Sequence, residues 1–241
     1  MNSFKSAGVT QLVECDLAKV DVAGSNPVSR SSPFPAMMKH YLLLFFAALT
    51  ASAQEYKLEP IAAAAPDLPA AYAAEIAAQG YRVVGPAGPW CEVWFRKTIP
   101  TGAKPSDPAV ALPIAQGTLI GVIRFPKAAA DRRGQQLKPG VYTLRYSNFP
   151  TDGAHQGVAP QRDFALASPI AADPDPKSSP DFDKLVAQSK QSGAAHAVVF
   201  SLEPPSGNTF PAVTKEGEHD IVLNAKVGDL PIGIIVAGRA E

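Results

Sequence analysis

Trp90-Cys91-Glu92-Val93-Trp94-Phe95-Arg96-Lys97 has the alternating character of a β-strand. Successive side chains of a strand point to opposite faces of the sheet. One face of this strand therefore carries Trp90, Glu92, Trp94 and Arg96, and the other carries Cys91, Val93, Phe95 and Lys97. The stretch predicts a strand with one apolar face and a second face that mixes indole rings with charges.

Seven further segments predict strands, because each combines β-branched or aromatic residues with flanking turn residues. They are residues 81–84, 117–125, 141–147, 164–167, 197–202, 221–227 and 232–237. A turn at 85–89 separates two of the strands as a hairpin. Before the strand at 141–147, Pro139 presets one turn angle and Gly140 accepts the positive one.

Two short helices interrupt the strands. The first is predicted over 68–79, with Asp67 near its cap and Gly80 as its stop. The second is capped by Ser179 and ends at Gly193, with Pro180 in its first turn. Mostly antiparallel strands with two short helices predict a mainly β fold, an antiparallel β-sandwich of about eight strands.

Three stretches resemble a group of exported bacterial β-sandwich proteins of unknown function. They are residues 90–97, residues 137–146 with their Pro139-Gly140-Val141-Tyr142 turn and strand, and residues 152–160. The resemblance extends over most of residues 68–240. It implies an exported β-sandwich and brings no established activity with it.

A signal peptide is predicted at residues 37–53. Met38-Lys39-His40 supplies a basic start, residues 41–49 are unbroken apolar, and Ala51-Ser52-Ala53 offers small residues for cleavage before Gln54. The apolar run is shorter than the roughly 20 residues that span a bilayer, so no stable membrane anchor is expected. We expect a soluble periplasmic or secreted protein.

Residues 1–36 precede this signal peptide and need an explanation. Residues 8–31 resemble a transfer-RNA gene read as protein, since Gly24-Ser25-Asn26-Pro27 can be encoded by the T-arm and Gln11-Leu12-Val13-Glu14 by the D-arm. We interpret residues 1–36 as a spurious start. The alternative is a genuine, disordered leader.

The remaining chain predicts one domain at 67–241, preceded by a flexible Ala- and Pro-rich approach at 54–66. Residues 54–241 contain 18 lysine and arginine residues against 19 aspartate and glutamate residues, a net charge of about −1. No basic patch indicates nucleic acid as a partner. A glycan, a small molecule or another protein remain as possible partners.

Cysteine usage adds one constraint. Cys15 falls in the leader, so Cys91 is alone in the domain and has no intrachain disulfide partner. An exposed thiol is prone to oxidation in an oxidising compartment. We therefore expect Cys91 to be buried with Val93 and Phe95, with a raised pKa.

The face with Trp90, Glu92, Trp94 and Arg96 is one candidate ligand site. Two indoles flanked by a carboxylate and a guanidinium would form a stacking platform for a sugar or another planar ligand. The alternative is a face covered by the helix at 68–79, with Glu92 and Arg96 paired at its rim. That alternative is favoured, because aromatic strand residues more often pack than bind.

The loop at 152–163 is the second candidate, with Asp152, His155, Arg162 and Asp163. Carboxylates near a histidine bind metals or transfer protons, and His196 and His219 would join them if the fold brought them together. The spacing matches no known motif, so no metal site is assigned. No Gly-x-Ser-x-Gly elbow, phosphate-binding glycine loop or cofactor motif is present.

Two functional hypotheses remain. The favoured one is an exported, noncatalytic module that binds a ligand or a partner. The alternative is a small extracytoplasmic enzyme or metal-binding protein that uses the loop at 152–163.

The first prediction concerns the start of the mature chain. Peptide sequencing of the native protein should find Gln54 at the amino terminus, because signal peptidase cleaves after small residues such as Ala53. Recovery of any peptide from residues 1–36 would refute the spurious start.

Overall fold

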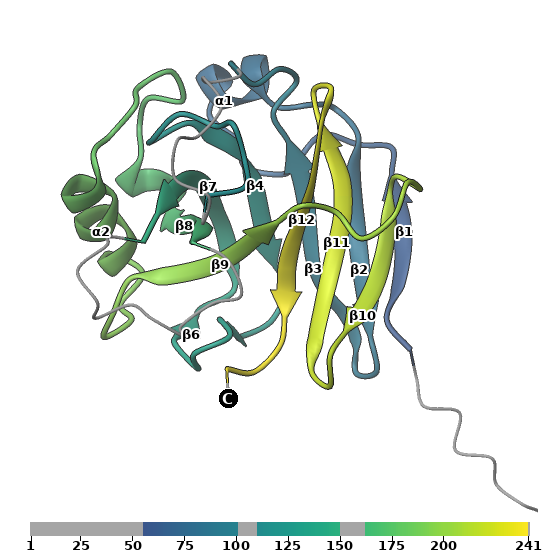
Figure 1. Cartoon of the computed structure of the whole chain (residues 1–241). Helices are drawn as coiled ribbons and strands as arrows, with labels where there is room; N and C mark the ends of the chain where they lie inside the picture. Colours follow the sequence, from purple (N-terminus) through teal and green to yellow (C-terminus); the bar gives the residue numbers. More distant parts are fainter. Residues whose placement is uncertain (1–54, 101–109, 150–161, 241) are drawn as a thin grey trace, which may run out of the picture. The chain divides into compact units, whose positions relative to one another are not determined.

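Ten strands form one antiparallel sheet in the computed structural model, which describes residues 55–100, 110–149 and 162–240 (Figure 1). In spatial order they are β1 (Lys57–Ile61), β2 (Gly80–Gly85), β3 (Gly88–Phe95), β4 (Leu119–Phe125), β7 (Gly140–Asn148), β8 (Asp163–Pro169), β9 (Val198–Glu203), β12 (Leu230–Ala237), β11 (Asp220–Val227) and β10 (Ala212–Glu216). A separate pair joins β5 (Ala129–Ala130) to β6 (Gln136–Leu137). Short hairpin turns join β2 to β3, β10 to β11 and β11 to β12.

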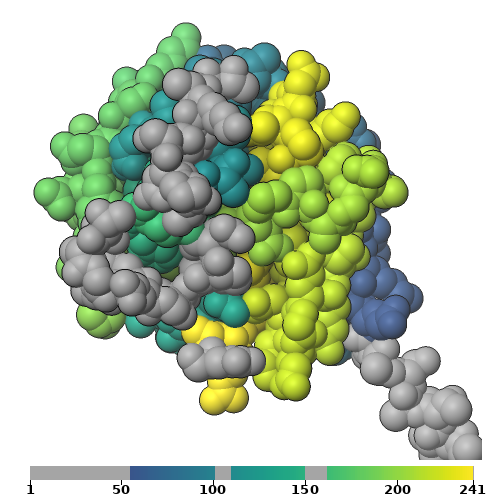
Figure 2. Space-filling model, in the orientation of Figure 1, coloured from purple at the N-terminus to yellow at the C-terminus, as the bar shows by residue number. Residues whose placement is uncertain are grey.

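The sheet curls until its two edges meet, so that it is nearly closed. One apolar cluster collects the inward side chains of the eight strands between the edges. Leu58 of β1 and Val213 of β10 pack against this same cluster from the two edges. β1 and β10 are in contact, and Figures 1 and 2 show them side by side. A single core inside a curled sheet replaces the layer between two sheets of a sandwich.

The prediction of a mainly antiparallel β fold with two short α-helices is confirmed, and the eight-stranded sandwich is wrong. All eight predicted strands are present, but β1 and β10 were not predicted. β1 lies within 54–66, the stretch expected to be a flexible approach. Its side chains are exposed or half-buried throughout, because an edge strand has a neighbour on one side only. Such a strand lacks the apolar alternation that reveals the others.

The two helices cover the outside of the sheet. α1 (Ala70–Glu75) begins after Pro69 with no side-chain cap, so the predicted cap at Asp67 and the end at residue 79 are wrong. α2 (Phe182–Lys190) is capped by Asp181, whose Oδ1 accepts a hydrogen bond of 2.9 Å from the amide of Lys184. Asp181 therefore takes the role predicted for Ser179. The 3-10 helix η1 (Ile170–Ala172) lies between β8 and α2.

Each α-helix covers its own small apolar cluster. Tyr72 and Ile76 pack with Trp94, Leu119 and Val122 on the outer face of β3 and β4. Under α2, Leu185 packs against outward residues of β8 and β9, among them Phe164, Leu166 and Val199. The two helices thus shield these parts of the outer face from water.

The predicted leader at 1–36 and signal peptide at 37–53 lie outside the described residues. No helix in the described ranges is long and apolar enough to cross a membrane.

Cys91 is fully buried in the interior cluster, as predicted from strand alternation. Burial raises the pKa of its thiol well above the ordinary value, and the nearby charge of Glu92 adds to the effect. The thiolate that would react with an electrophile is therefore strongly disfavoured.

We predict that Cys91 behaves as a small core hydrophobe. A thiol reagent should label the folded protein slowly and the denatured protein at once. Cys91→Ser should lower the free energy of unfolding by about 1 to 3 kcal/mol, because the hydroxyl enters an apolar site. Rapid labelling of the folded protein would contradict the burial.

Candidate functional site

Trp90 does not share a face with Trp94, because β3 contains an irregularity next to it. The pairing of β2 with β3 shifts between Val83, which faces Cys91, and Val84, which faces Pro89. Trp90 is left without a strand partner and packs against the interior cluster. Its indole nitrogen donates to the carbonyl of Val236 at 2.8 Å. Strict alternation therefore gives the wrong face for this residue.

Trp94 lies on the outside, beneath the chain that leads into α1. It is 1% exposed, and its indole nitrogen donates to the carbonyl of Ala63 at 2.8 Å. Its ring occupies the space beside Gly80, where an added Cβ would come within 2.4 Å of the indole nitrogen. The predicted stacking platform is not formed, and the covered face is found instead.

Glu92 belongs to a row of charges across neighbouring strands. Its carboxylate bonds to Arg82 at 2.8 Å and to Arg124 at 2.7 Å. Burial opposes the ionisation of Glu92, but hydrogen bonds from both guanidinium groups outweigh it and lower the pKa. Arg96 bonds to Glu75 of α1 at 2.9 Å, so the predicted pairing of Glu92 with Arg96 is wrong.

Asp163, the described carboxylate of the second candidate, is fully buried at the start of β8. It accepts hydrogen bonds from the amides of Ala111 at 2.8 Å and Leu112 at 3.1 Å, and from the hydroxyl of Tyr146 at 2.6 Å. These bonds fix the segment before β4 against the sheet. Asp163 therefore has a structural role.

The other members of that candidate are not brought together by the described structure. Asp152 and His155 lie outside the described residues. His196 lines a pocket under α2, whereas His219 lies in the β10–β11 turn and pairs with Glu218 at 3.7 Å. In the part of the chain that the structure describes, no group of three or more His, Cys, Asp or Glu side chains is placed to hold a metal ion.

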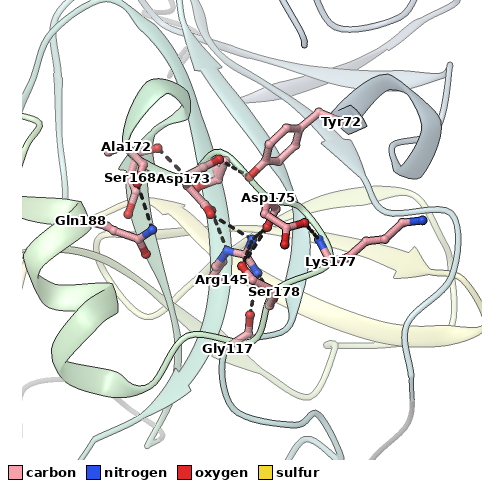
Figure 3. Close-up of polar contacts among 11 residues, drawn as sticks. Tyr72, Gly117, Arg145, Ser168, Ala172, Asp173, Asp175, Lys177, Ser178 and Gln188 are labelled. Atoms are coloured by element: carbon pink, nitrogen blue, oxygen red, sulfur yellow. Dashed lines mark hydrogen bonds and ion pairs between the residues drawn. The ribbon is translucent and has the colours of Figure 1, made fainter. Parts of the chain in front are cut away.

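Arg145 of β7 is the centre of a buried polar network, which Figure 3 shows. The guanidinium is 1% exposed and grips Asp173 with two bonds, from Nε at 2.5 Å and from Nη2 at 2.9 Å. Its remaining donors reach backbone carbonyls at 2.6 to 2.8 Å, those of Gly117, Asp175 and Ser178. Tyr72 adds a hydroxyl that donates to the carbonyl of Asp173 at 2.7 Å.

This network is saturated and therefore structural. A guanidinium has five N–H donors, and each one of Arg145 has a partner within the protein. Nothing is left over to bind a ligand. The network instead fastens the segment between β8 and α2 to the outer face of the sheet.

A second set of buried charges is different, because two of its oxygens have no donor. Glu203 ends β9 and is only 9% exposed, and Glu216 ends β10. Among the described residues, Glu203 Oε1 and Glu216 Oε1 are the only buried carboxylate oxygens without a hydrogen-bond partner. Both residues line one pocket of about 310 Å³ on the outer face of the sheet.

Sheet order and one glycine make this meeting possible. β12 and β11 lie between β9 and β10, so the two glutamates must reach across them. Gly233 of β12 pairs with Glu203, and an added Cβ there would lie 3.1 Å from Glu203 Cγ and 3.0 Å from Val222 Cγ1. The missing side chain leaves the path along which Glu203 extends. Ile235 provides an apolar wall of the same pocket.

The surroundings favour a proton on this pair. Burial, then the charge of Glu216 and a hydrogen bond with it, raise the pKa of Glu203 to about 7. Asp220 raises it further, and Arg132 lowers it. Arg132 bonds to Asp220 at 2.7 Å and is thereby engaged elsewhere. Burial and the neighbouring carboxyl group therefore favour the protonated form of Glu203.

Such a pair has two chemical uses, to exchange a proton or to accept hydrogen bonds from a ligand. Sequence reasoning missed it, although Glu203 follows an apolar strand and Glu216 precedes a Gly217 turn. These positions are 13 residues apart in the sequence. That they line one pocket can be recognised only from the sheet order, in which β12 and β11 lie between their strands.

Comparison of the chain with protein-family models, with curated proteins and with solved structures gave no match.

The Arg145 network generates the next prediction. Asp173→Ala should lower the free energy of unfolding by about 3 to 5 kcal/mol in urea denaturation, because it leaves a buried guanidinium without its anion. The double change Arg145→Met with Asp173→Leu should lower the free energy of unfolding by less, since it removes both charges and leaves neither one unpaired.

Glu59→Ala serves as the control for this prediction. Glu59 pairs with Arg82 at 3.4 Å, and its side chain is 53% exposed. Its removal should change the free energy of unfolding by less than about 1 kcal/mol. An equally small loss for Asp173→Ala would show that Arg145 does not depend on Asp173.

Proposed function

We propose that this protein is an exported, noncatalytic binding module that holds a small ligand in the pocket of Glu203 and Glu216. The observation that carries the proposal is the pair of buried carboxylate oxygens without a donor, both of which line one pocket. Buried polar groups are almost always hydrogen-bonded in native proteins. A ligand with N–H or O–H groups would supply the missing donors.

Pocket size and shape support the same proposal. Ligand pockets usually measure about 300 to 1,000 Å³ and combine apolar walls with a few directed polar groups. The pocket here has about 310 Å³, an apolar wall at Ile235 and the two carboxyl groups. A compact ligand, or one end of a longer ligand, fits this volume.

A glycosidase-type use of the pair is less well supported. Enzymes that cleave glycosides place their two carboxyl groups about 5 to 9.5 Å apart, to flank the bond or admit a water. Glu203 and Glu216 are within hydrogen-bonding reach of each other. The short separation thus favours the binding of a hydrogen-bond donor by both groups. It is less suited to one group acting as general acid and the other as general base.

Export is part of the proposal and is supported by the signal-peptide pattern at 37–53. The alternative function, an enzyme or metal-binding protein using the loop at 152–163, stays a prediction. Of that loop, the structure describes only Arg162 and Asp163, and Asp163 is engaged within the fold.

The proposal predicts that the native protein retains a small molecule. Mass spectrometry of protein purified from its exported compartment should find an enriched molecule. The double variant Glu203→Gln with Glu216→Gln should lose it, because amide groups satisfy each other and remove the charge. Glu59→Gln, the same chemical change on β1 outside the pocket, should retain it.

Equal retention by the wild type and the double variant would refute the pocket as the site. If no small molecule is enriched with the wild-type protein, the result would count against a binding function.

A further inference from the structure

We propose that the ligand of this pocket carries a primary ammonium group on a short aliphatic stem, and that it binds between Glu203 and Glu216 by displacing a proton from Glu203. This inference rests on the proposed binding function and names the chemical class of the ligand. It follows from the free acceptor oxygens, the charges and the shape of the pocket.

The free groups of the pocket are acceptors. Glu203 Oε1 and Glu216 Oε1 are buried and receive no hydrogen bond from the described protein. They come from two different side chains, so each offers one oxygen to the space between them. An ammonium group is a compact charge with three rotatable donors, which suits two separate oxygens. A planar guanidinium is better matched to both oxygens of one carboxylate, as with Arg145 and Asp173.

The charges around the pocket leave it negative. Four carboxylates line it, from β9, β10, the β10–β11 turn and the start of β11: Glu203, Glu216, Glu218 and Asp220. Against them stand two guanidinium groups, Arg132 from the β5–β6 loop and Arg239 from the chain after β12. Arg132 is bonded to Asp220 at 2.7 Å, and Arg239 is exposed. His219 is exposed and paired with Glu218.

A divalent metal is a poorer occupant of this pocket. Calcium takes six to eight oxygen ligands, and magnesium requires a near-octahedral set. The described residues contain no group of three or more potential metal ligands in suitable positions. Two free oxygens are sufficient for one ammonium group and insufficient for either metal.

The shape of the pocket provides for an aliphatic stem. Ile235 supplies an apolar wall of the pocket. Methylene groups beside Ile235 would be removed from water, at roughly 0.8 kcal/mol for each group that is fully buried. An alkylammonium therefore combines the charge with the apolar contact.

Binding and protonation compete for the same two oxygens. An ammonium group that contacts both of them requires both carboxyl groups to be ionised, so the proton of Glu203 leaves to the solvent. The bound state thus gains one ammonium and loses one proton. Because Glu203 has a pKa of about 7, competition weakens binding by about 30-fold at pH 5.5 relative to pH 8.5. An alkylammonium stays protonated over this range, as a lysine side chain does.

The test is calorimetric and NMR titration of the purified protein with n-butylammonium chloride at pH 5.5, 7 and 8.5. We expect the affinity to rise with pH by about 30-fold overall. Titration at pH 6 in two buffers of different ionisation enthalpy should show the release of close to one proton for each ligand bound. 1-Butanol, which has the same stem without the charge, should bind at least 10-fold more weakly at pH 8.5.

Two variants test whether Glu203 and Glu216 bind the n-butylammonium ion. Glu203→Gln and Glu216→Gln should each weaken binding at pH 8.5 by at least 10-fold and abolish its pH dependence. Circular dichroism of both variants establishes that they are folded, and either one suffices if the other does not fold. Glu59→Gln should bind as the wild type does.

Binding that does not change with pH, equal binding of 1-butanol, or no binding of n-butylammonium would overturn the inference. The proposed binding function would survive such a failure if a neutral or anionic molecule were retained by the wild type and lost from the Glu203→Gln, Glu216→Gln double variant. Failure of both experiments would remove the pocket as a functional site.

Discussion

A buried positive charge must be fully surrounded by acceptors, and Arg145 imposes this requirement on the outer face of the sheet. Its donors are met by the Asp173 carboxylate and by carbonyls at 117, 175 and 178, which belong to two segments of the chain (Figure 3). Those acceptors are in place only when the segment after β8 lies against the sheet. That segment leads into α2, and its Asp173 also holds Tyr72 of α1. One guanidinium thus connects both helices to the curled sheet. Its burial costs desolvation free energy, as the burial of any charge does.

The central strands could be predicted from sequence, and the closure of the sheet could not. Strands such as β4 and β9 are largely apolar and buried along most of their length, because they have neighbours on both sides and a core beneath them. The edge strands β1 and β10 carry lysine, glutamate and threonine, and every residue in them is exposed or half-buried. Their pairing is set by backbone hydrogen bonds and by what lies opposite, which a single sequence does not display. Without them eight strands predict two stacked sheets, whereas ten strands form one curled sheet.

The side chains of β3 show where strand alternation succeeds and where it fails. It places Cys91 correctly inside, because the pairing with β2 is regular from Tyr81 to Val83. It fails at Trp90, because one irregular step in that pairing moves the indole to the interior. A bulge depends on two strands together, so no pattern within one strand reveals it. The same limit applies to Glu203 and Glu216, which meet only through the order of four strands.

The buried charge clusters of the described chain differ in how completely the fold itself supplies their hydrogen-bond partners. Glu92 has two arginines and Arg145 has an acceptor for every donor, so each cluster is satisfied by the fold itself. In the Glu203 pair, Glu203 Oε1 and Glu216 Oε1 have no hydrogen-bond donor in the described protein. The pKa of Glu203 in the folded protein lies above its ordinary value of 4.5. The folded state therefore holds more protons than the unfolded state between about pH 4.5 and pH 7, and the contribution of this group to stability falls as pH rises through that window. The fold satisfies the Glu92 and Arg145 clusters without a ligand and leaves the Glu203 pair without a donor, which is the physical argument for assigning the pair to a ligand.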